Sequence, residues 1–148
     1  MKAVIQRVSS ASVHVDQQLH SNIDGGLLVY LGVEKGDNEQ TLQYMVHKCV
    51  NLRIFSDDKG KMNLSLLQKP LQMLVVSQFT LCASLKKGNR PSFDYAADPA
   101  VALHLYELFI QKIQLYGITV KTGVFGAHMH VSSVNDGPVT IIIDSADA

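Results

Sequence analysis

The strongest constraint on the fold is an apolar run that turns polar without a break. Residues 73–76 (Met-Leu-Val-Val) are followed directly by Ser77-Gln78-Phe79-Thr80-Leu81, with no glycine or proline between the two segments. A short continuous apolar run is typical of a fully buried strand. Uncompensated polar groups in a core cost several kcal/mol, so we expect Ser77, Gln78 and Thr80 either to line a cleft or to bond neighbouring strands.

A second unusual segment, Asn135-Asp136-Gly137-Pro138, lies near the other end of the chain. Its residues are turn formers, and the simplest interpretation is a β-turn between two strands. A Gly-Pro bond is also a place where a cis peptide is accessible, because the trans form is favoured by only about 0.5–1 kcal/mol.

Length and composition indicate one domain covering residues 1–148, large enough to bury a core of its own. Two distant cysteines do not suggest a disulfide framework, so we expect a reducing compartment. The first residues, Met-Lys-Ala-Val-Ile-Gln-Arg, do not resemble a signal peptide, and no apolar run is long enough to span a membrane. We therefore expect a soluble, cytoplasmic protein without membrane contact.

The charge is unevenly distributed, although the net charge of the chain is zero. Residues 53–90 hold seven basic and two acidic residues, a net charge of +5, and the remainder carries −5. This asymmetry permits a basic patch suited to a phosphate-bearing ligand. The alternative is an ordinary solvated loop surface.

Hydrophobic periodicity predicts an α+β domain with a mainly antiparallel sheet, curled into a barrel-like shape, and two flanking helices. For the first helix we expect Asp37 as N-cap with Gln40 as its capping-box partner. For the second we expect Asp98 as N-cap, Pro99 at the first helical position and Gly117 after the end. The apolar stripe of the first helix is Leu42, Met45, Val46, Cys49 and Val50, and that of the second is Ala102, Tyr106, Phe109 and Ile113. The expected strands are residues 2–8, 13–15, 19–23, 27–33, 51–55, 73–81, 118–122, 128–134 and 139–143.

Residue types alone leave the chemistry open. Ser77 or Thr80 could act as a nucleophile, but a hydroxyl needs an activating base, and none is adjacent in sequence. Cys82 lacks a positive group nearby until Lys86. His128 and His130 would point to one face of a strand, but no third metal ligand is evident, so we predict no metal site.

The two polar segments together resemble the two-motif signature of D-aminoacyl-tRNA deacylases, also called D-tyrosyl-tRNA deacylases. The motifs are Ser77-Gln78-Phe79-Thr80-Leu81 and Asn135-Asp136-Gly137-Pro138-Val139-Thr140. Supporting pieces are Ile5-Gln6-Arg7-Val8, Ala11-Ser12-Val13, Leu31-Gly32-Val33, Arg53-Ile54-Phe55-Ser56-Asp57, Gly60-Lys61-Met62-Asn63 and Arg90-Pro91-Ser92-Phe93. The resemblance extends from Met1 to about Ile143.

This resemblance implies hydrolysis of the ester that joins a D-amino acid, or glycine, to tRNA, with L-aminoacyl-tRNA rejected and no cofactor required. It also implies a homodimer of barrel-like subunits with two sites at the interface. Each site would join Ser77, Gln78, Phe79 and Thr80 of one subunit to a cis Gly137-Pro138 of the other. Arg7 would help to hold the Gly-Pro element.

The implied chemistry suits these residues. An aminoacyl ester is already activated, so positioning and stabilisation of the oxyanion matter more than a strong nucleophile. We expect the backbone N–H groups of Phe79 and Thr80 to stabilise the oxyanion, and Thr80 to assist by hydrogen bonding without being acylated. Lys86, Lys87 and Arg90 are candidates for contact with tRNA phosphates. Two other classes remain open, a tRNA-binding module without activity and a conventional Ser/Thr hydrolase.

Overall fold

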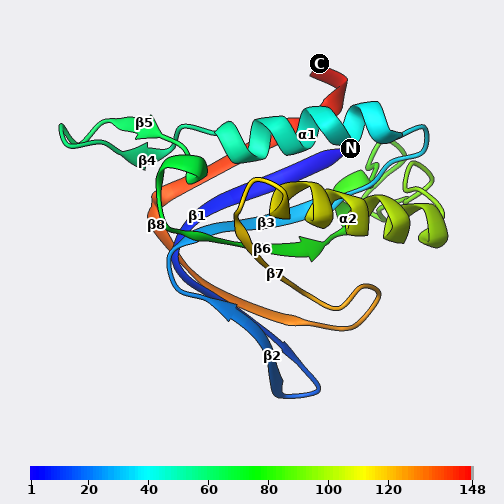
Figure 1. Cartoon of the computed structure of the whole chain (residues 1–148). Helices are drawn as coiled ribbons and strands as arrows, with labels where there is room; N and C mark the ends of the chain where they lie inside the picture. The colour runs from blue at the N-terminus through cyan, green and yellow to red at the C-terminus, as the bar shows by residue number, and fades with distance from the viewer. Residues whose placement is uncertain (148) are drawn as a thin grey trace.

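The computed structural model describes residues 1–147, which form one large sheet, a small two-stranded sheet and two α-helices (Figure 1). The strands of the large sheet are β1 (Lys2–Val15), β2 (Gln18–Ile23), β3 (Gly26–Gly32), β6 (Gln72–Ser77), β7 (Thr119–Thr122) and β8 (His130–Asp144). The helices are α1 (Glu39–Asn51) and α2 (Pro99–Gln114). Two short strands, β4 (Phe55–Ser56) and β5 (Met62–Leu64), form a separate hairpin.

The large sheet is mixed, with the order β2-β1-β3-β6-β7 and with β8 along the other edge of β1. The long strand β1 pairs antiparallel with β2, β3 and β8, whereas β3, β6 and β7 run parallel to one another. Parallel neighbours require crossover connections, and α1 and α2 lie in those two connections. The predicted α+β class with a mainly antiparallel, barrel-like sheet is confirmed, with a parallel centre that the prediction did not include.

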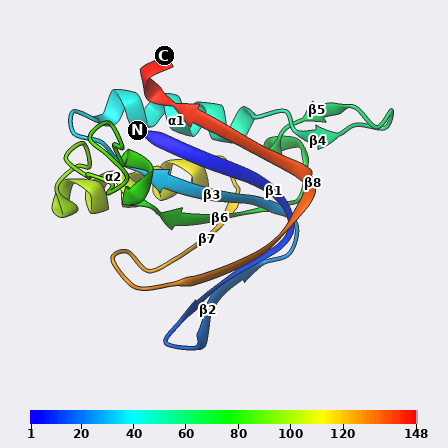
Figure 2. The same cartoon turned by 180° about the vertical axis from the view of Figure 1, so that it is seen from behind.

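Both helices cover the same face of this sheet, and the lower half of β1 curls away from them with β2 (Figures 1 and 2). The predicted stripe of α1 is buried throughout, and Tyr106, Phe109 and Ile113 of α2 are buried beside it. A second, smaller core forms on the opposite side of the sheet, where the curled strands fold back over its face. It consists of Val8, Ala11, Val13, Ile23, Leu28, Leu74 and Val76.

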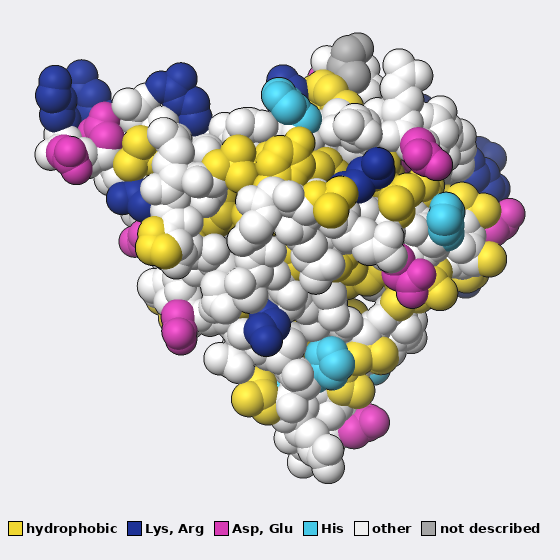
Figure 3. Space-filling view, in the orientation of Figure 1, with side chains coloured by type: hydrophobic (Ala, Val, Ile, Leu, Met, Phe, Trp, Pro, Cys, Tyr) yellow, Lys and Arg dark blue, Asp and Glu magenta, His cyan; other side chains and the backbone are white. Residues whose placement is uncertain are grey.

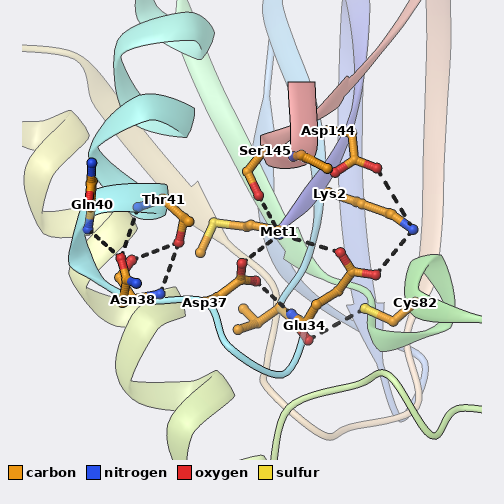
Figure 4. A network of polar contacts seen from close by, with 12 residues as sticks. Met1, Lys2, Glu34, Asp37, Asn38, Gln40, Thr41, Cys82, Asp144 and Ser145 are labelled. Carbon is orange, nitrogen blue, oxygen red and sulfur yellow. Dashed lines mark hydrogen bonds and ion pairs between the residues drawn. The ribbon is translucent and has the colours of Figure 1, made fainter. Parts of the chain in front are cut away.

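The N-cap of α1 is Asn38 rather than the predicted Asp37. The Asn38 side chain accepts hydrogen bonds from the N–H groups of Gln40 and Thr41, and the Thr41 hydroxyl accepts one from the Asn38 N–H. Asp37 has different partners, because its carboxylate accepts from the Glu34 N–H and from the α-ammonium group of Met1, both at 2.7 Å (Figure 4).

Other strand predictions are also corrected. Residues 51–55 are not a strand, because α1 continues to Asn51 and only Phe55 and Ser56 pair with β5. The predicted strands 128–134 and 139–143 are joined in one continuous strand, β8, which begins at His130. The predicted strands 2–8 and 13–15 are likewise joined in β1. Within residues 1–147, no helix is long and apolar enough to cross a membrane.

Candidate active site

The first motif leaves the sheet at Ser77, the last residue of β6, and Phe79–Cys82 form a short 3₁₀ helix. The predicted continuation of the strand to Leu81 is therefore wrong. Ser77 and Gln78 are half-buried, and the Phe79 and Thr80 side chains are exposed. The Gln78 side-chain amide donates a hydrogen bond to the Thr80 hydroxyl. The polar end of the buried strand thus faces outward and not into the core.

Close contact with the end of β3 holds this turn in place. The Gln78 N–H donates to the Leu31 carbonyl at 2.8 Å, and the Cys82 thiol donates to the Val33 carbonyl at 3.4 Å. Between these two contacts, a Cβ added to Gly32 would lie 2.9 Å from the Gln78 carbonyl oxygen and 3.0 Å from the Leu81 Cβ. Only glycine leaves room for the turn at this position.

The structure offers no conventional activated nucleophile in this motif. Burial is the main factor that raises the pKa of the Cys82 thiol, to about 11, so the thiol is protonated at neutral pH. Among the hydrogen bonds of residues 1–147, none joins Ser77 or Thr80 to a histidine or a carboxylate. This arrangement lacks the base that a serine or threonine nucleophile requires.

An aromatic pair lies beside the turn, with the rings of Phe79 and Phe93 in edge contact at 4.9 Å. Phe93 belongs to the segment that follows the predicted basic loop. That loop is closed by an antiparallel bridge between Ser84 and Ser92 and carries Lys86, Lys87 and Arg90 as exposed residues. The fold therefore brings the basic loop next to the first motif.

The segment 123–129 also adjoins the end of β6, which the sequence interpretation missed. The Gly123 N–H donates to the Val75 carbonyl at 3.0 Å, and the Val124 N–H donates to the Met129 sulfur at 3.3 Å. A Cβ at Gly123 would lie 2.6 Å from that sulfur. The pair Gly123 and Gly126, close together between two predicted strands, was the available signal.

The second motif is a bulge in β8 and not the predicted turn. Asn135 pairs with Val8 and Thr140 pairs with Gln6, so the four residues 136–139 lie opposite Arg7 alone. The Asn135 side chain fastens the bulge, because its oxygen accepts from the Val139 N–H at 2.7 Å and its amide donates to the Val139 carbonyl at 3.2 Å. The Gly137-Pro138 peptide is cis, as the resemblance implies, and Gly137 has φ +144°.

Arg7 connects this bulge to the base of the β4–β5 hairpin. Its Nε donates to the Asp136 carbonyl at 2.9 Å, and its Nη1 donates to the Ile54 carbonyl at 2.5 Å. Its Nε also lies 3.3 Å from an Asp136 carboxylate oxygen. The Arg7 side chain is only 14% exposed, and its Nη2 would lie 3.1 Å from a Cβ on Gly137. Arg7 is thus in direct contact with the Gly-Pro element.

Comparison with known proteins identifies the family. The family model for D-Tyr-tRNA(Tyr) deacylase matches residues 4–144. The chain belongs to this family. It is 52% identical to a D-aminoacyl-tRNA deacylase of Thermosipho africanus over 98% of this chain and 97% of the relative. It is 55% identical to a protein of the same name in Geotalea daltonii, again over 98% of this chain and 97% of the relative.

Solved structures agree with the fold of this deacylase family member. A structure described as c-Myc DNA unwinding element binding protein superimposes with a TM-score of 0.92 and 41% identity, over 97% of this chain and 98% of that one. A probable eukaryotic D-amino acid tRNA deacylase superimposes with a TM-score of 0.81 at 17% identity, over 96% of this chain and 97% of the other, and shares the fold. The family predicted from the two motifs is confirmed, and with it the enzyme class, a deacylase.

The two motifs do not meet within one chain of this deacylase. Arg7, opposite the bulge, is in register with Leu27, and Leu27 with Met73, which lies four residues before Ser77 along β6. Strands β1 and β3 stand between β8 and β6. With strands about 4.8 Å apart and a rise of about 3.3 Å per residue, the two motifs lie on the order of 15–20 Å apart. A single aminoacyl ester cannot contact both.

The histidines do not form a metal site. His128 and His130 are exposed and stack edge to face at 5.2 Å, and His14 is the cross-strand partner of His130. In the described part of the chain, no three His, Cys, Asp or Glu side chains are arranged to hold a metal ion.

Proposed function

We propose that the protein hydrolyses the ester between a D-amino acid and tRNA at a site shared by two copies of the chain. One copy supplies Ser77, Gln78, Phe79 and Thr80, and the other supplies the cis Gly137-Pro138. The observation that carries this proposal is the separation of about 15–20 Å between the two motifs in one chain. Residues 1–148 act as one domain in the cytoplasm, where aminoacyl-tRNA is used.

Exposed apolar side chains support association of two copies. Ile141 and Ile143 pack toward the helices, so the alternation of β8 turns Ile142 to the opposite face, where it is 74% exposed. Phe79 and Val134 are each 58% exposed. A second copy would bury such surface, which contributes about 25 cal/mol for each Å² of apolar area removed from water.

The first motif supplies the groups that an activated ester needs. Phe79 and Thr80 are the first two residues of a 3₁₀ helix, so their N–H groups have no partner inside that helix. They are available to an oxyanion. In enzymes where one such donor has been removed, the transition state lost about 3–4 kcal/mol of stabilisation. Thr80, held by Gln78, orients the substrate or the attacking water and is not acylated. The ribose 2′-hydroxyl of the substrate assists in orienting that water.

The second motif supplies the discrimination against L-amino acids. The backbone of Gly137 and Pro138 grips the α-amino side of the substrate, and an L side chain would point into this backbone. Asn135 and Arg7 fix the bulge at both ends, so it cannot yield. Such a wall excludes L residues whatever their side chain, whereas glycine, which has none, still fits.

The basic loop supplies contacts to the nucleic acid. Lys86, Lys87 and Arg90 are exposed beside the turn that carries Phe79 and Thr80. Contacts between cations and phosphates release counterions, so affinity for tRNA falls steeply as salt rises.

The test is deacylation of D-Tyr-tRNA and L-Tyr-tRNA by the purified protein. The wild type should release only the D-amino acid, and Thr80→Ala should lower kcat without preventing tRNA binding. Gly137→Ala should reduce the D-over-L ratio, since its Cβ would lie 2.8 Å from a Val139 methyl group. Gly117→Ala is the matched control, because Gly117 also has positive φ (+78°) but no atom near its Cβ.

Three outcomes would contradict the proposal. A protein that binds both tRNAs and leaves both esters intact is a binding module. A trapped acyl-Thr80 would indicate a conventional hydrolase. An unchanged D-over-L ratio in Gly137→Ala, with the control also unchanged, would remove the second motif from the discrimination.

A further inference from the structure

The β4–β5 hairpin projects from the body of the molecule and has a basic tip (Figures 1 and 3). Its residues Arg53, Lys59 and Lys61 are exposed. No ion pair of the described residues includes any of the three. The hairpin makes no contribution to the first motif of its own chain, because it lies at the other end of the molecule from the turn after β6 (Figure 1).

Hydrogen bonds at the tip of the hairpin use the backbone N–H groups of Lys59 and Lys61 and not their side chains. The Asp57 carboxylate accepts from the N–H groups of Lys59 and Lys61, at 2.9 and 3.0 Å, and from the Asn63 amide at 3.1 Å. Arg53 donates to the Asn63 carbonyl at 2.8 Å and to its side-chain oxygen, which braces the strands. The hairpin is therefore a preorganised support for two free ammonium groups.

The base of the hairpin is fastened to the second motif. The Arg7 guanidinium donates to the Ile54 carbonyl at 2.5 Å and to the Asp136 carbonyl at 2.9 Å. Ile54 and Lys59 are five residues apart, so the lysine backbone lies within roughly 17 Å of Ile54, the residue that Arg7 links to the bulge, even if the chain is fully extended. The position of the tip is thus tied to the position of Gly137-Pro138.

We propose that the hairpin is an arm that contacts phosphates of the aminoacyl-tRNA at the shared site to which its own chain contributes Gly137-Pro138. This inference rests on the proposed function, since it requires the two motifs of one site to come from different copies. Six of the seven basic residues between 53 and 90, all but Lys69, then have a common explanation. Each shared site would be flanked by Lys86, Lys87 and Arg90 of one copy and by Arg53, Lys59 and Lys61 of the other.

The first test compares Lys59→Ala/Lys61→Ala with wild type on two substrates. With D-Tyr-tRNA we expect KM to rise about tenfold and the slope of log affinity against log salt to flatten by about two. With D-tyrosyl adenosine, which carries the ester but no phosphate, the rate should not change. The substitutions spare the hairpin because Asp57 binds the backbone N–H groups of both lysines.

The control variant is Lys112→Ala/Lys121→Ala, which removes the same charge from α2 and β7. It should leave KM and the salt slope as in wild type. An equal effect of both double variants would indicate general electrostatics and overturn the inference. So would a loss of dimer stability in Lys59→Ala/Lys61→Ala with an unchanged salt slope, since the hairpin would then bind the partner subunit.

A mixed dimer separates failure of this inference from failure of the shared site. One subunit carries Thr80→Ala and the other Gly137→Ala, so only one site keeps both motifs intact, with its Gly137-Pro138 from the Thr80→Ala subunit. The hairpin substitutions should raise KM when placed on the Thr80→Ala subunit and have no effect on the other.

An inactive mixed dimer would refute the shared site. An active mixed dimer with the same KM, whichever subunit carries the hairpin substitutions, would refute the arm and leave the shared site standing.

Discussion

Replacing Gly32 by alanine should reduce the turnover of the deacylase without unfolding it. The added Cβ would lie 2.9 Å from the Gln78 carbonyl oxygen and 3.0 Å from the Leu81 Cβ, whereas ordinary contacts begin at 3.4 Å. One side must move by about 0.5 Å. Strand β3 is paired on both sides, to Lys2 of β1 and, through Leu31, to Ser77 of β6, so the exposed turn moves.

The size of the effect follows from the geometry of the reacting groups. A misplacement of 1 Å can cost about 100-fold in rate, so a shift of half that size should lower kcat about tenfold. Because the proposed tRNA contacts lie in the basic loop and the β4–β5 hairpin and not in the turn, KM should change little. Overpacking of this kind destabilises a protein by about 1–3 kcal/mol, which a urea titration would detect while the native fold persists.

Gly25→Ala is the matched control. Gly25 directly precedes the other end of the same strand. Its added Cβ would meet a Leu71 methyl group at 3.1 Å, which can rotate away, and the Val8 carbonyl oxygen at an ordinary 3.9 Å. Its kcat on D-Tyr-tRNA should stay within about twofold of wild type, as for most substitutions away from a special site. A folded Gly32→Ala protein with wild-type kcat, or an equal loss in Gly25→Ala, would refute this account of how the turn is positioned.

Three further predictions concern charges and thiols. Asp37→Asn removes one carboxylate from the fully buried Met1 ammonium and should lower the free energy of unfolding, measured in urea, by about 3 kcal/mol. The control is Asp144→Asn, which removes a partly exposed pair with Lys2 at 3.9 Å and should lower it by less than about 1 kcal/mol. The N–H groups of Lys61 and then Lys59 lower the pKa of Asp57 below its usual 3.8. The ionised carboxylate therefore stabilises the hairpin above that pH, and this contribution is lost as pH falls through the lowered pKa. Hydrogen exchange of the tip amides should show the loss, and Asp57→Asn should abolish the pH dependence of that exchange protection. Burial raises the pKa of the Cys49 thiol to about 12 and that of Cys82 to about 11. Both thiols should therefore resist thiol reagents at pH 8 until urea is added, and rapid labelling of the native protein would contradict this expectation. The stability that the protonated thiols contribute should decline as pH rises above 9.

The helices were predictable from the sequence because their signals are local. The stripe from Leu42 to Val50 repeats with the period of a helix, and every member is buried. The N-cap was placed one residue early, on Asp37, because Asp37 and Asn38 are both good caps. What separates them is a long-range contact, since the Asp37 carboxylate binds the α-ammonium group of Met1.

The candidate site was less predictable because register decides it. Asn135-Asp136-Gly137-Pro138 has the composition of a turn, and turn chemistry is the only information that the segment itself carries. In the structure the chain does not reverse there, because residues on both sides pair with the same strand β1. The four extra residues are accommodated opposite Arg7, whose contacts with Asp136 and Ile54 join parts of the chain that are distant in sequence.

The parallel centre of the sheet explains why the first motif occupies its position. In parallel sheets, ligands bind beyond the carboxyl ends of the strands, and β3, β6 and β7 all end on the side where Leu31 and Val33 hold the turn after Ser77. The second motif belongs to β8, an antiparallel edge strand, and its bulge lies toward the opposite end of the parallel strands. No movement of a loop can bring it to the turn, because the bulge is paired to β1 on both sides. If both motifs contact one ester, the second must come from another copy, and a variant that prevents dimer formation should be inactive even though each chain retains every residue of both motifs.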